Sequence, residues 1–460
     1  MIRLSRLVVG GYIARSVYMT ASMILSSRSM RSSAAITEKA PIDPEPVLTV
    51  IIPALREQTV MPRSLAWFGR LAGDWPQLRV LVVTATRETA QTPAGQQTTE
   101  QLCRELARQH NDRLGRQVFH VVSYPGQGRR ASQLNYAVTA LDRLWPPTGD
   151  DYVAVYDADA VPDARLRAHV ARAAAGRPAM IQQPMLPAFP AGIGGSRSAV
   201  MSGQDLAAFR RTVGIEYRRI NVARWCAPGN GHRVLATVMR PMVYGVGSGL
   251  IVRRDKIEDI GFFQEPHDDL AVGHRLSMAG EPIAALPSVN VVEPYQSVAS
   301  MARAFSSVAF ANTATHRDYR FAAARPTRLS RAGQRLLAVR ALADGATWAL
   351  GPPVMVAAVA HLVVRREFKP LAVAALTAAV IEPVVAYRLR GQLLRDFRSP
   401  DPAGVNWQQP AALPSIATFV VQPAVSALGP WLLGLRAVTA ALTGRGLRFT
   451  KTEHVGEPAR

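Results

Sequence analysis

The stretch Tyr152-Val153-Ala154-Val155-Tyr156-Asp157-Ala158-Asp159-Ala160-Val161-Pro162 determines how the rest of the sequence is interpreted. It begins with an apolar run of Tyr, Val and Ala, which predicts a buried strand, and Pro162 prevents further strand pairing. Two carboxylates, Asp157 and Asp159, follow this strand directly. Ligands of α/β sheets bind at the carboxyl ends of parallel strands, and Mg²⁺ binds there to a few carboxylates together with phosphate oxygens. The stretch therefore predicts a metal–diphosphate site, with a polar turn that caps a strand as the alternative.

Apolar strands and helical patterns alternate on both sides of this stretch. We expect strands at 47–54, 78–84, 118–122, 152–156, 180–183, 245–252 and 289–292, and helices around Leu65–Leu71 and at 98–114, 131–144, 164–175, 203–224 and 269–279. This alternation predicts an α/β fold with a mostly parallel, mixed sheet.

The composition limits the partners of the chain. The 460 residues carry a formal charge of +21, and only four of the 54 basic residues are lysines. Such a charge suits nucleic acid, an anionic membrane surface or anionic substrates. No helix-turn-helix, zinc-finger or RNA-recognition signature accompanies it, so we expect no nucleic-acid partner. Cys103 and Cys226 are too few for a disulfide framework, which indicates structural thiols in a reducing compartment.

The two ends of the chain differ from the middle. Leu4–Leu25 is moderately apolar but interrupted by arginines, and 26–46 is rich in Ser, Arg and Pro, so 1–46 is expected to be disordered or amphipathic. Three apolar segments follow Arg331, and a bilayer needs about 20 such residues per helix. We predict a catalytic domain at 47–330, a membrane domain of about three helices at 331–445 and a polar tail at 446–460. The apolar segments are Thr347–Val364, Pro370–Tyr387 and Pro410–Leu435. A buried helical hairpin in a soluble domain is the alternative.

A second acidic pair, Asp268-Asp269, precedes a helical pattern. Carboxylates are favoured at helix N-termini by the helix dipole, and simple N-capping explains many of them. A carboxylate in this position is also suited to deprotonate an incoming hydroxyl as a general base.

Two glycine-containing segments complete the set of candidate motifs. Tyr124–Asn135 contains Gly126, Gly128 and two arginines before a helix start, a combination that can cradle a diphosphate. Gly245–Asp255 contains glycines that allow a ligand to approach the backbone closely. Ordinary tight turns have the same composition.

The order of these motifs resembles that of the family-2 inverting glycosyltransferases, in particular the membrane-bound branch with cellulose- and hyaluronan-synthase-like enzymes. The resemblance covers residues 47–295 and rests on five motifs in sequence: Pro-Ala-x-Arg-Glu, Arg-Arg-Ala-Ser-Gln-Leu-Asn, Asp-Ala-Asp, Gly-Ser-Gly before Arg-Arg-Asp, and Asp-Asp-Leu-x-x-Gly-x-Arg-Leu. It implies a nucleotide-diphospho-sugar transferase (GT-A-like) domain followed by C-terminal transmembrane helices. The implied reaction is a metal-dependent, single-displacement sugar transfer from a nucleotide sugar.

The resemblance also implies roles for individual residues. Asp157 and Asp159 would bind Mg²⁺ or Mn²⁺ and the donor diphosphate, Asp269 would be the general base, and Asp268 would be its acidic neighbour on the acceptor side. The remaining donor-side positions are Pro53, Ala54, Arg56, Glu57, Arg130 and Asn135. Apart from the resemblance, the further acceptor-side candidates are Gln182, Gln183, Gly247, Gly249 and Trp225, and for Trp225 a core position is at least as compatible.

Two departures from the family pattern limit the implied function. The family carries an Asp after the second strand for the nucleotide base, whereas this chain has Val83–Glu88 without an Asp, so the nucleotide is not specified. The Gln-x-x-Arg-Trp motif of processive synthases is absent from 296–305, which favours single transfers. We expect a lipid-linked or polysaccharide acceptor and a multi-pass plasma-membrane enzyme with a cytoplasmic catalytic domain, active in cell-envelope polysaccharide biosynthesis. The alternatives are a processive synthase or a degenerate sugar-nucleotide-binding scaffold.

Overall fold

A seven-stranded sheet forms the centre of the computed structural model, which describes residues 2–37, 45–93, 95–190, 198–227, 233–265, 267–399 and 407–443. The strand order is β3-β2-β1-β4-β8-β5-β9, and all strands run parallel except β8, which is antiparallel to both neighbours. The expected α/β fold with a mostly parallel, mixed sheet is confirmed. The strands are β1 (Val47–Pro53), β2 (Leu78–Ala85), β3 (Phe119–Tyr124), β4 (Asp151–Val155), β5 (Met180–Gln182), β8 (Leu250–Arg253) and β9 (Ile283–Ala285).

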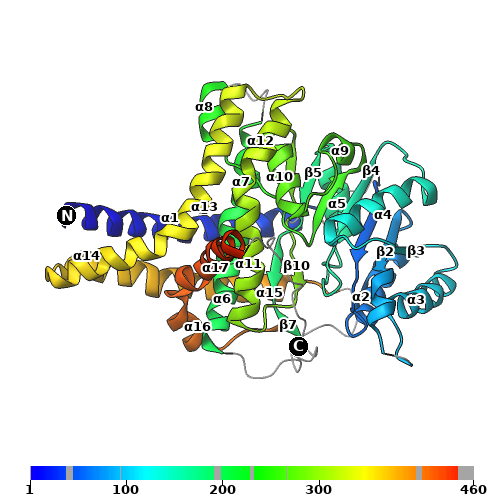
Figure 1. Cartoon of the computed structure of the whole chain (residues 1–460), viewed down its shortest axis with the longest axis horizontal. Coiled ribbons are helices and arrows are strands. Elements are labelled where there is room, and N and C mark those ends of the chain that lie inside the picture. The colour runs from blue at the N-terminus through cyan, green and yellow to red at the C-terminus, as the bar shows by residue number, and fades with distance from the viewer. Residues whose placement is uncertain are drawn as a thin grey trace.

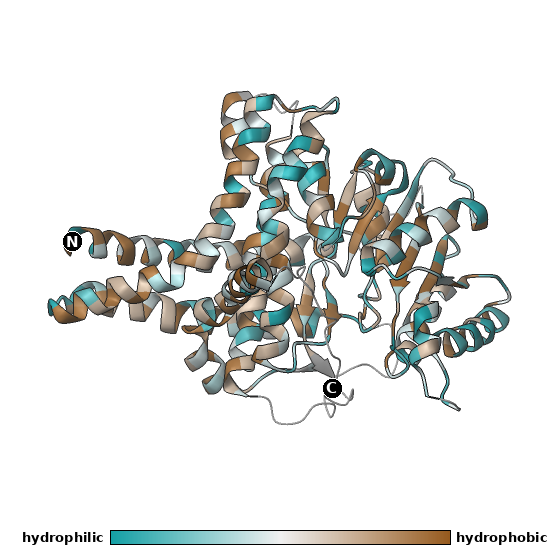
Figure 2. Ribbon diagram, viewed as in Figure 1, coloured by the Kyte–Doolittle hydropathy of each residue, from teal (hydrophilic) through white to brown (hydrophobic). Residues whose placement is uncertain are grey.

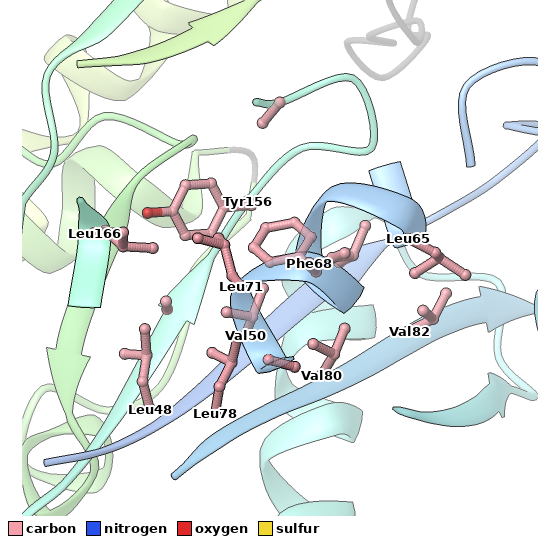
Figure 3. Packing of buried hydrophobic residues seen from close by; sticks show 14 of the residues in the cluster. Leu48, Val50, Leu65, Phe68, Leu71, Leu78, Val80, Val82, Tyr156 and Leu166 are labelled. Atoms are coloured by element: carbon pink, nitrogen blue, oxygen red, sulfur yellow. The ribbon is translucent and has the colours of Figure 1, made fainter. Parts of the chain in front are cut away.

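Helices cover both faces of this sheet, because its central strands are apolar on both sides. One face packs against α2 (Met61–Asp74), α3 (Thr99–Leu114) and α5 (Leu166–Ala174). Figure 3 shows Leu65, Phe68 and Leu71 lying over the strand residues of this core, and the Phe68 ring meets Tyr156 edge-on at 5.5 Å. The other face packs against α4 (Arg130–Leu144), α7 (Arg218–Trp225), α9 (Arg254–Asp259) and α10 (Asp268–Ala279). Cys103 and Cys226 are buried free thiols, and burial raises the pKa of Cys103 to about 12.

The region 180–292 differs most from the expected element order. The predicted strand at 289–292 is β10 (Asn290–Val292), but it pairs with β6 (Met185–Pro187) outside the main sheet. Strand β9 was not predicted. The predicted helix at 203–224 is part of a continuous helical run in which α6 (Ala199–Phe209) and α7 flank a π-helical segment, η2 (Arg210–Tyr217). The shorter elements are η1 (Thr86–Gln91), β7 (Phe189–Pro190), α8 (Arg233–Met239), α11 (Val298–Thr313), α12 (Thr315–Ala323) and β11 (Trp407–Gln408).

Among the residues that the structure describes, four helices are long and apolar enough to cross a membrane. Three of them follow residue 330, as expected: α13 (Arg331–Val364), the run Phe368–Asp396 and α17 (Gln422–Thr443). The run Phe368–Asp396 comprises α14 (Phe368–Ala374), the π-helical η3 (Ala375–Ile381) and α15 (Glu382–Asp396), and a short helix α16 (Ala412–Phe419) precedes α17.

The fourth such helix is at the N-terminus and corrects an expectation. Helix α1 extends from Ile2 to Thr37, so residues 26–37, which were expected to be disordered, continue the helix. Polar residues do not end it because Ser22, Ser26 and Ser27 are buried against the rest of the protein. Residues 38–44 and the predicted polar tail at 446–460 lie outside the described residues.

The apolar helices lie together at one end of the molecule. In Figure 1, α1 and α14 run side by side away from the sheet, and in Figure 2 their residues are largely hydrophobic. Only 11% of the most apolar window of α13, and the same share of that of α17, is buried within the protein. Their outward faces therefore form an apolar surface that no described part of the chain covers, which is typical of membrane or partner contact.

Candidate functional site

A single cavity of about 1560 Å³ connects the carboxyl ends of β1 and β4 to the apolar helices. It gathers residues from segments that are far apart in the sequence. Among the predicted site residues, those that line it are Pro53, Glu57, Arg130, Asp157, Asp159, Gly247, Asp268 and Asp269.

The pair Asp157 and Asp159 occupies a tight turn after β4. The Ala160 amide donates to the Asp157 carbonyl at 3.0 Å, and this turn directs the chain away from the sheet. Asp159 is buried, and its Oδ2 accepts a hydrogen bond from the Glu293 amide at 2.8 Å. The Asp157 side chain is 39% exposed in the cavity. One carboxylate is therefore fixed by the backbone, and the other faces the space where a ligand would bind.

Arg130, the first residue of α4, connects the two acidic pairs. Its Nη2 donates to Asp157 Oδ1 at 2.9 Å and to the Gly247 carbonyl at 3.2 Å, while its Nη1 donates to Asp268 Oδ2 at 2.5 Å. Burial by itself lowers the pKa of Arg130, but Asp268, Asp157 and Asp269 outweigh it and raise the pKa. The guanidinium is therefore permanently charged at the centre of the site.

Asp268 and Asp269 begin α10, and their environments shift their pKa values in opposite directions. Burial, together with the neighbouring Asp269 charge, raises the pKa of Asp268 despite its ion pair with Arg130. Burial also opposes ionisation of Asp269, but His267, Arg130 and the Leu270 amide together hold the pKa of Asp269 below its usual value. His267 Nδ1 lies 3.6 Å from Asp269 Oδ1. Asp269 is therefore the member of the pair that is ionised and available to accept a proton.

The glycine-rich segment before β8 forms the wall between these groups. A Cβ atom on Gly247 would lie 3.2 Å from both Arg130 Nη1 and Asp269 Oδ2, so a side chain there would press on both. A Cβ on Gly245 would lie 2.5 Å from the Asp269 carbonyl oxygen. Close approach of the loop to α10 therefore requires glycine at these positions.

Several predicted residues support the site instead of lining it. Gln182 and Gln183 are buried: Gln182 bonds the Val246 amide at 2.9 Å, and Gln183 accepts from the Tyr156 hydroxyl at 2.5 Å. The residues that do not line the cavity are Ala54, Arg56, Asn135, Gln182, Gln183, Trp225 and Gly249. Trp225 is 55% exposed at the end of α7, which is neither the acceptor-facing nor the core position considered for it.

Asn135 and the start of α4 also differ from expectation. Asn135 Nδ2 donates to the Phe263 carbonyl at 3.0 Å, and its Oδ1 accepts from the Phe263 amide at 2.9 Å. The amides of Arg129 and Ser132, expected to cradle a diphosphate, instead donate to Glu265 Oε1 at 3.1 and 3.4 Å. Glu265 therefore neutralises this helix start, and Arg130 remains the principal cation beside Asp157.

Sequence reasoning missed the role of Glu88, which ends the segment in which no Asp was found. Glu88 is buried and accepts hydrogen bonds from the Thr99 amide and hydroxyl, from Gln58 and from the Arg56 amide. It fixes the loop after β1, in which Arg56 has a left-handed φ of 57°. Glu88 therefore shapes the pocket beside Pro53 but does not line it.

The acidic pair after β4 fits a hard divalent cation only with help from a substrate. Within the described residues, no group of three or more His, Cys, Asp or Glu side chains is arranged to hold a metal ion. Asp157 and Asp159 supply two carboxylates, and Mg²⁺ is commonly held by one or two carboxylates plus substrate phosphates. The donor set therefore suits a cation that binds together with a phosphorylated ligand.

Comparisons with known proteins give only distant likenesses. No family model matches the sequence, and no curated protein is significantly similar to it. A solved structure described as the mannosyltransferase PcManGT from Pyrobaculum calidifontis, in complex with GDP-Man and Mn²⁺, has 15% identity and a TM-score of 0.47, over 91% of this chain and 99% of that one. The structure of S. aureus TarS 1–349 in complex with UDP has 12% identity and a TM-score of 0.37, over 89% and 98%. At TM-scores below 0.5 these likenesses establish no family, and the function is argued below from the site itself.

Proposed function

We propose that this protein is a membrane-bound, metal-dependent, inverting glycosyltransferase that moves a sugar from a nucleotide-sugar donor to a lipid-linked or polysaccharide acceptor. One observation carries the proposal: Asp157 and Asp159, Arg130, and Asp268 and Asp269 come from three distant segments and meet in one cavity. Charge for a leaving diphosphate and an ionised base are thereby placed side by side, which is the combination that displacement at an activated sugar requires.

The residues divide the reaction between them. Asp269 takes the proton of the acceptor hydroxyl as its oxygen forms a bond to the anomeric carbon of the sugar. The bond from that carbon to the donor diphosphate breaks, and its electron pair leaves with the diphosphate. Arg130 lies between Asp268 and Asp157, where its charge offsets the negative charge that grows on the leaving diphosphate. Attack and departure on opposite faces of the sugar invert the anomeric configuration.

A divalent cation, Mg²⁺ or Mn²⁺, would be held by Asp157 and Asp159 together with donor phosphate oxygens, and it would add positive charge to the leaving diphosphate. The pocket beside Pro53 and Glu57 lies on the β1 side of Asp157 and would accept the nucleotide. The base and the sugar of the donor are not assigned.

The apolar helices would place this site at a membrane surface. Four helices of the described chain are long enough to span, and exposed apolar residues cover α13, α14 and α17. We place the catalytic domain on the cytoplasmic side of the plasma membrane. A processive synthase is disfavoured by the absence of Gln-x-x-Arg-Trp from 296–305.

The test is a transfer assay on the full chain in membranes, with a panel of nucleotide sugars and either Mg²⁺ or Mn²⁺. We expect one donor to be consumed only with metal. Asp269→Asn should lower turnover by roughly 10²–10⁴-fold as general-base catalysis is lost, and Asp159→Asn should raise the metal requirement. Asp112→Asn, on the exposed face of α3, is the matched control and should retain full turnover.

Two other outcomes would change the proposal. Donor binding without turnover in the wild type would favour the scaffold alternative. Long product chains would favour the processive synthase.

A further inference from the structure

The cavity that holds the catalytic groups is also lined by arginines on the side of the apolar helices, and we call this part of the cavity the chamber. Five arginines from α1, η2 and α7 line it, and we call them the membrane-side arginines: Arg15, Arg210, Arg211, Arg218 and Arg219. At about 1560 Å³ the cavity exceeds the roughly 300–1,000 Å³ that a single small ligand occupies. The chamber therefore provides room for a second molecule beside a nucleotide sugar.

Carboxylates neutralise only part of this group. Arg210 pairs with Glu382 at 3.2 Å and Arg211 with Glu216 at 3.1 Å. Arg219 pairs with Asp344 at 2.7 Å. In contrast, Arg15 and Arg218 make no hydrogen bond or ion pair with the part of the chain that the structure describes.

Arg15 also lies in an unusual place for a charge. It belongs to a helix that is apolar enough to span a membrane, and it lies near Arg210, whose like charge repels it, and near Glu382 and Asp344, whose charges attract it. Ionisable side chains within such helices are costly, and they mark ligand paths when they face a cavity. A bound anion would relieve the repulsion.

The membrane-side arginines share the cavity with the reaction site. Arg211 and Tyr295 line it together with Asp157, Asp159 and Asp269. The charges of Arg211 and Asp269 also influence each other over this space. A ligand that extends along the cavity from Arg211 would therefore approach the proposed general base.

The same chamber is continuous with the outer apolar surface. Val354 and Val356 of α13 line the cavity, yet they are 50% and 66% exposed, and Val420, which also lines it, is 45% exposed. Apolar residues of α1, including Val8 and Met19, form the wall beside Arg15. An apolar tail can therefore leave the chamber between these helices while a charged headgroup remains inside.

We propose that the chamber binds the acceptor, and that this acceptor is a lipid whose headgroup carries both a phosphate ester and a hydroxyl. The phosphate contacts the membrane-side arginines, the hydroxyl faces Asp269, and the tail lies along α1 and α13. This rests on the proposed function for the identity of the bound molecule as an acceptor, but the lipid site itself is testable without any donor.

The experiment measures binding of a fluorescent phosphatidylinositol analogue to the full chain in detergent micelles without nucleotide sugar. Unlabelled phosphatidylinositol, phosphatidylcholine and inorganic phosphate serve as competitors. Arg15→Gln and Arg218→Gln are the test variants, because neither breaks an ion pair within the described structure. Arg3→Gln is the matched control, since Arg3 is an exposed residue of α1 that does not line the cavity.

We expect unlabelled phosphatidylinositol to compete, and phosphatidylcholine and inorganic phosphate to compete poorly. Each test variant should weaken lipid binding about tenfold, the size of one charged hydrogen bond, while Arg3→Gln binds like the wild type and nucleotide-sugar affinity is unchanged. Equal competition by phosphatidylcholine or by inorganic phosphate would overturn the proposal. Weakened binding of the nucleotide sugar with unchanged lipid binding would overturn it too, by assigning the arginines to the donor.

Failure of the proposed function has a different signature. Selective, arginine-dependent lipid binding in a protein that turns over no nucleotide sugar would support the lipid site and overturn the transferase.

Discussion

Replacing Arg130 by methionine removes two ion pairs of unequal strength. The Asp268 side chain is only 5% exposed, and losing its partner leaves a buried carboxylate beside Asp269. Breaking a buried pair from one side typically costs about 3–5 kcal/mol. Because Arg130 is itself 29% exposed, solvent screening places the cost at the low end. The Asp157 side chain is 39% exposed, so that pair adds less than about 1 kcal/mol. We expect Arg130→Met to destabilise the protein by about 3 kcal/mol.

The assay is thermal unfolding of the full chain in detergent, followed in a double-mutant cycle with Asp268→Asn. At about 2 °C per kcal/mol for a large domain, Arg130→Met should unfold about 6 °C below the wild type. The double variant should recover much of that loss, because the unpaired charge is gone. If the effects of Arg130→Met and Asp268→Asn on stability were simply additive, the coupling between Arg130 and Asp268 would be refuted. A wild-type Tm for Arg130→Met would show that this ion pair behaves as an exposed one.

Four further substitutions have expected outcomes. Gly247→Ala places a methyl group 3.2 Å from both Arg130 Nη1 and Asp269 Oδ2, so kcat/KM should fall about tenfold with little change in Tm. In Gly273→Ala the new Cβ would lie 2.1 Å from the Gly245 amide nitrogen, so this variant should instead lose about 3 kcal/mol of stability. Gly73→Ala, with open space around it, is the control for both. His267→Ala removes a group that lowers the pKa of Asp269, so the acidic limb of kcat/KM should move to higher pH. An unmoved limb would mean that burial, Arg130 and the Leu270 amide set that pKa. Glu88→Gln puts an amide NH₂ against the amides of Arg56 or Thr99, so the free energy of unfolding should fall by about 1–3 kcal/mol, which a thermal melt would measure as a lower Tm. An unchanged Tm would show that water replaces those bonds.

The meeting of the acidic pairs was accessible from sequence because each pair carries a local signal. Asp157 and Asp159 follow a buried strand, and Asp268 and Asp269 begin a helix, so their positions within those elements were predictable from hydrophobic patterning and charge. Arg130 was likewise expected at a helix start. The ion pairs that connect these elements needed the structure, because Arg130 lies 27 residues from Asp157 and 138 residues from Asp268 in the sequence.

Other roles depend on pairings that local sequence does not encode. Strand β8 inserts between β4 and β5, and this order buries Gln182 behind the glycine loop instead of exposing it to a ligand. Glu88 accepts a hydrogen bond from the Arg56 amide, 32 residues earlier in the chain, and no local sequence pattern predicts such a bond. Arg15 counted against a membrane span in the sequence. In the structure it lines the cavity, and ionisable residues of apolar helices that face a cavity commonly mark ligand paths, which is why we include Arg15 in the proposed lipid site.

The apolar helices and the catalytic core share packing that crosses the predicted boundaries at 46 and 331. One hydrophobic cluster contains Met23 of α1, Phe209 of α6 and Leu393 of α15. Glu382, the first residue of α15 and the residue directly after η3, accepts hydrogen bonds from Ser16 of α1 at 2.6 Å and from Arg210 of η2 at 3.2 Å. Glu382 therefore connects η2 and α1 to the end of η3, and such π-helical segments often mark functional positions.

Because η2 carries both Arg210 and Arg211, the hydrogen bonds of Glu382 to α1 and η2 hold these arginines in place in the chamber that Asp269 also lines. Cutting the chain at either predicted boundary would remove Arg15 or Glu382 and leave a charged, buried group without its neighbours. A soluble fragment comprising 47–330 would therefore lose a wall of its own site, and the two proposals must be tested on the full chain. If such a fragment nevertheless used a soluble acceptor at the full rate, the membrane helices would have no part in acceptor binding, and the lipid chamber would have to be abandoned.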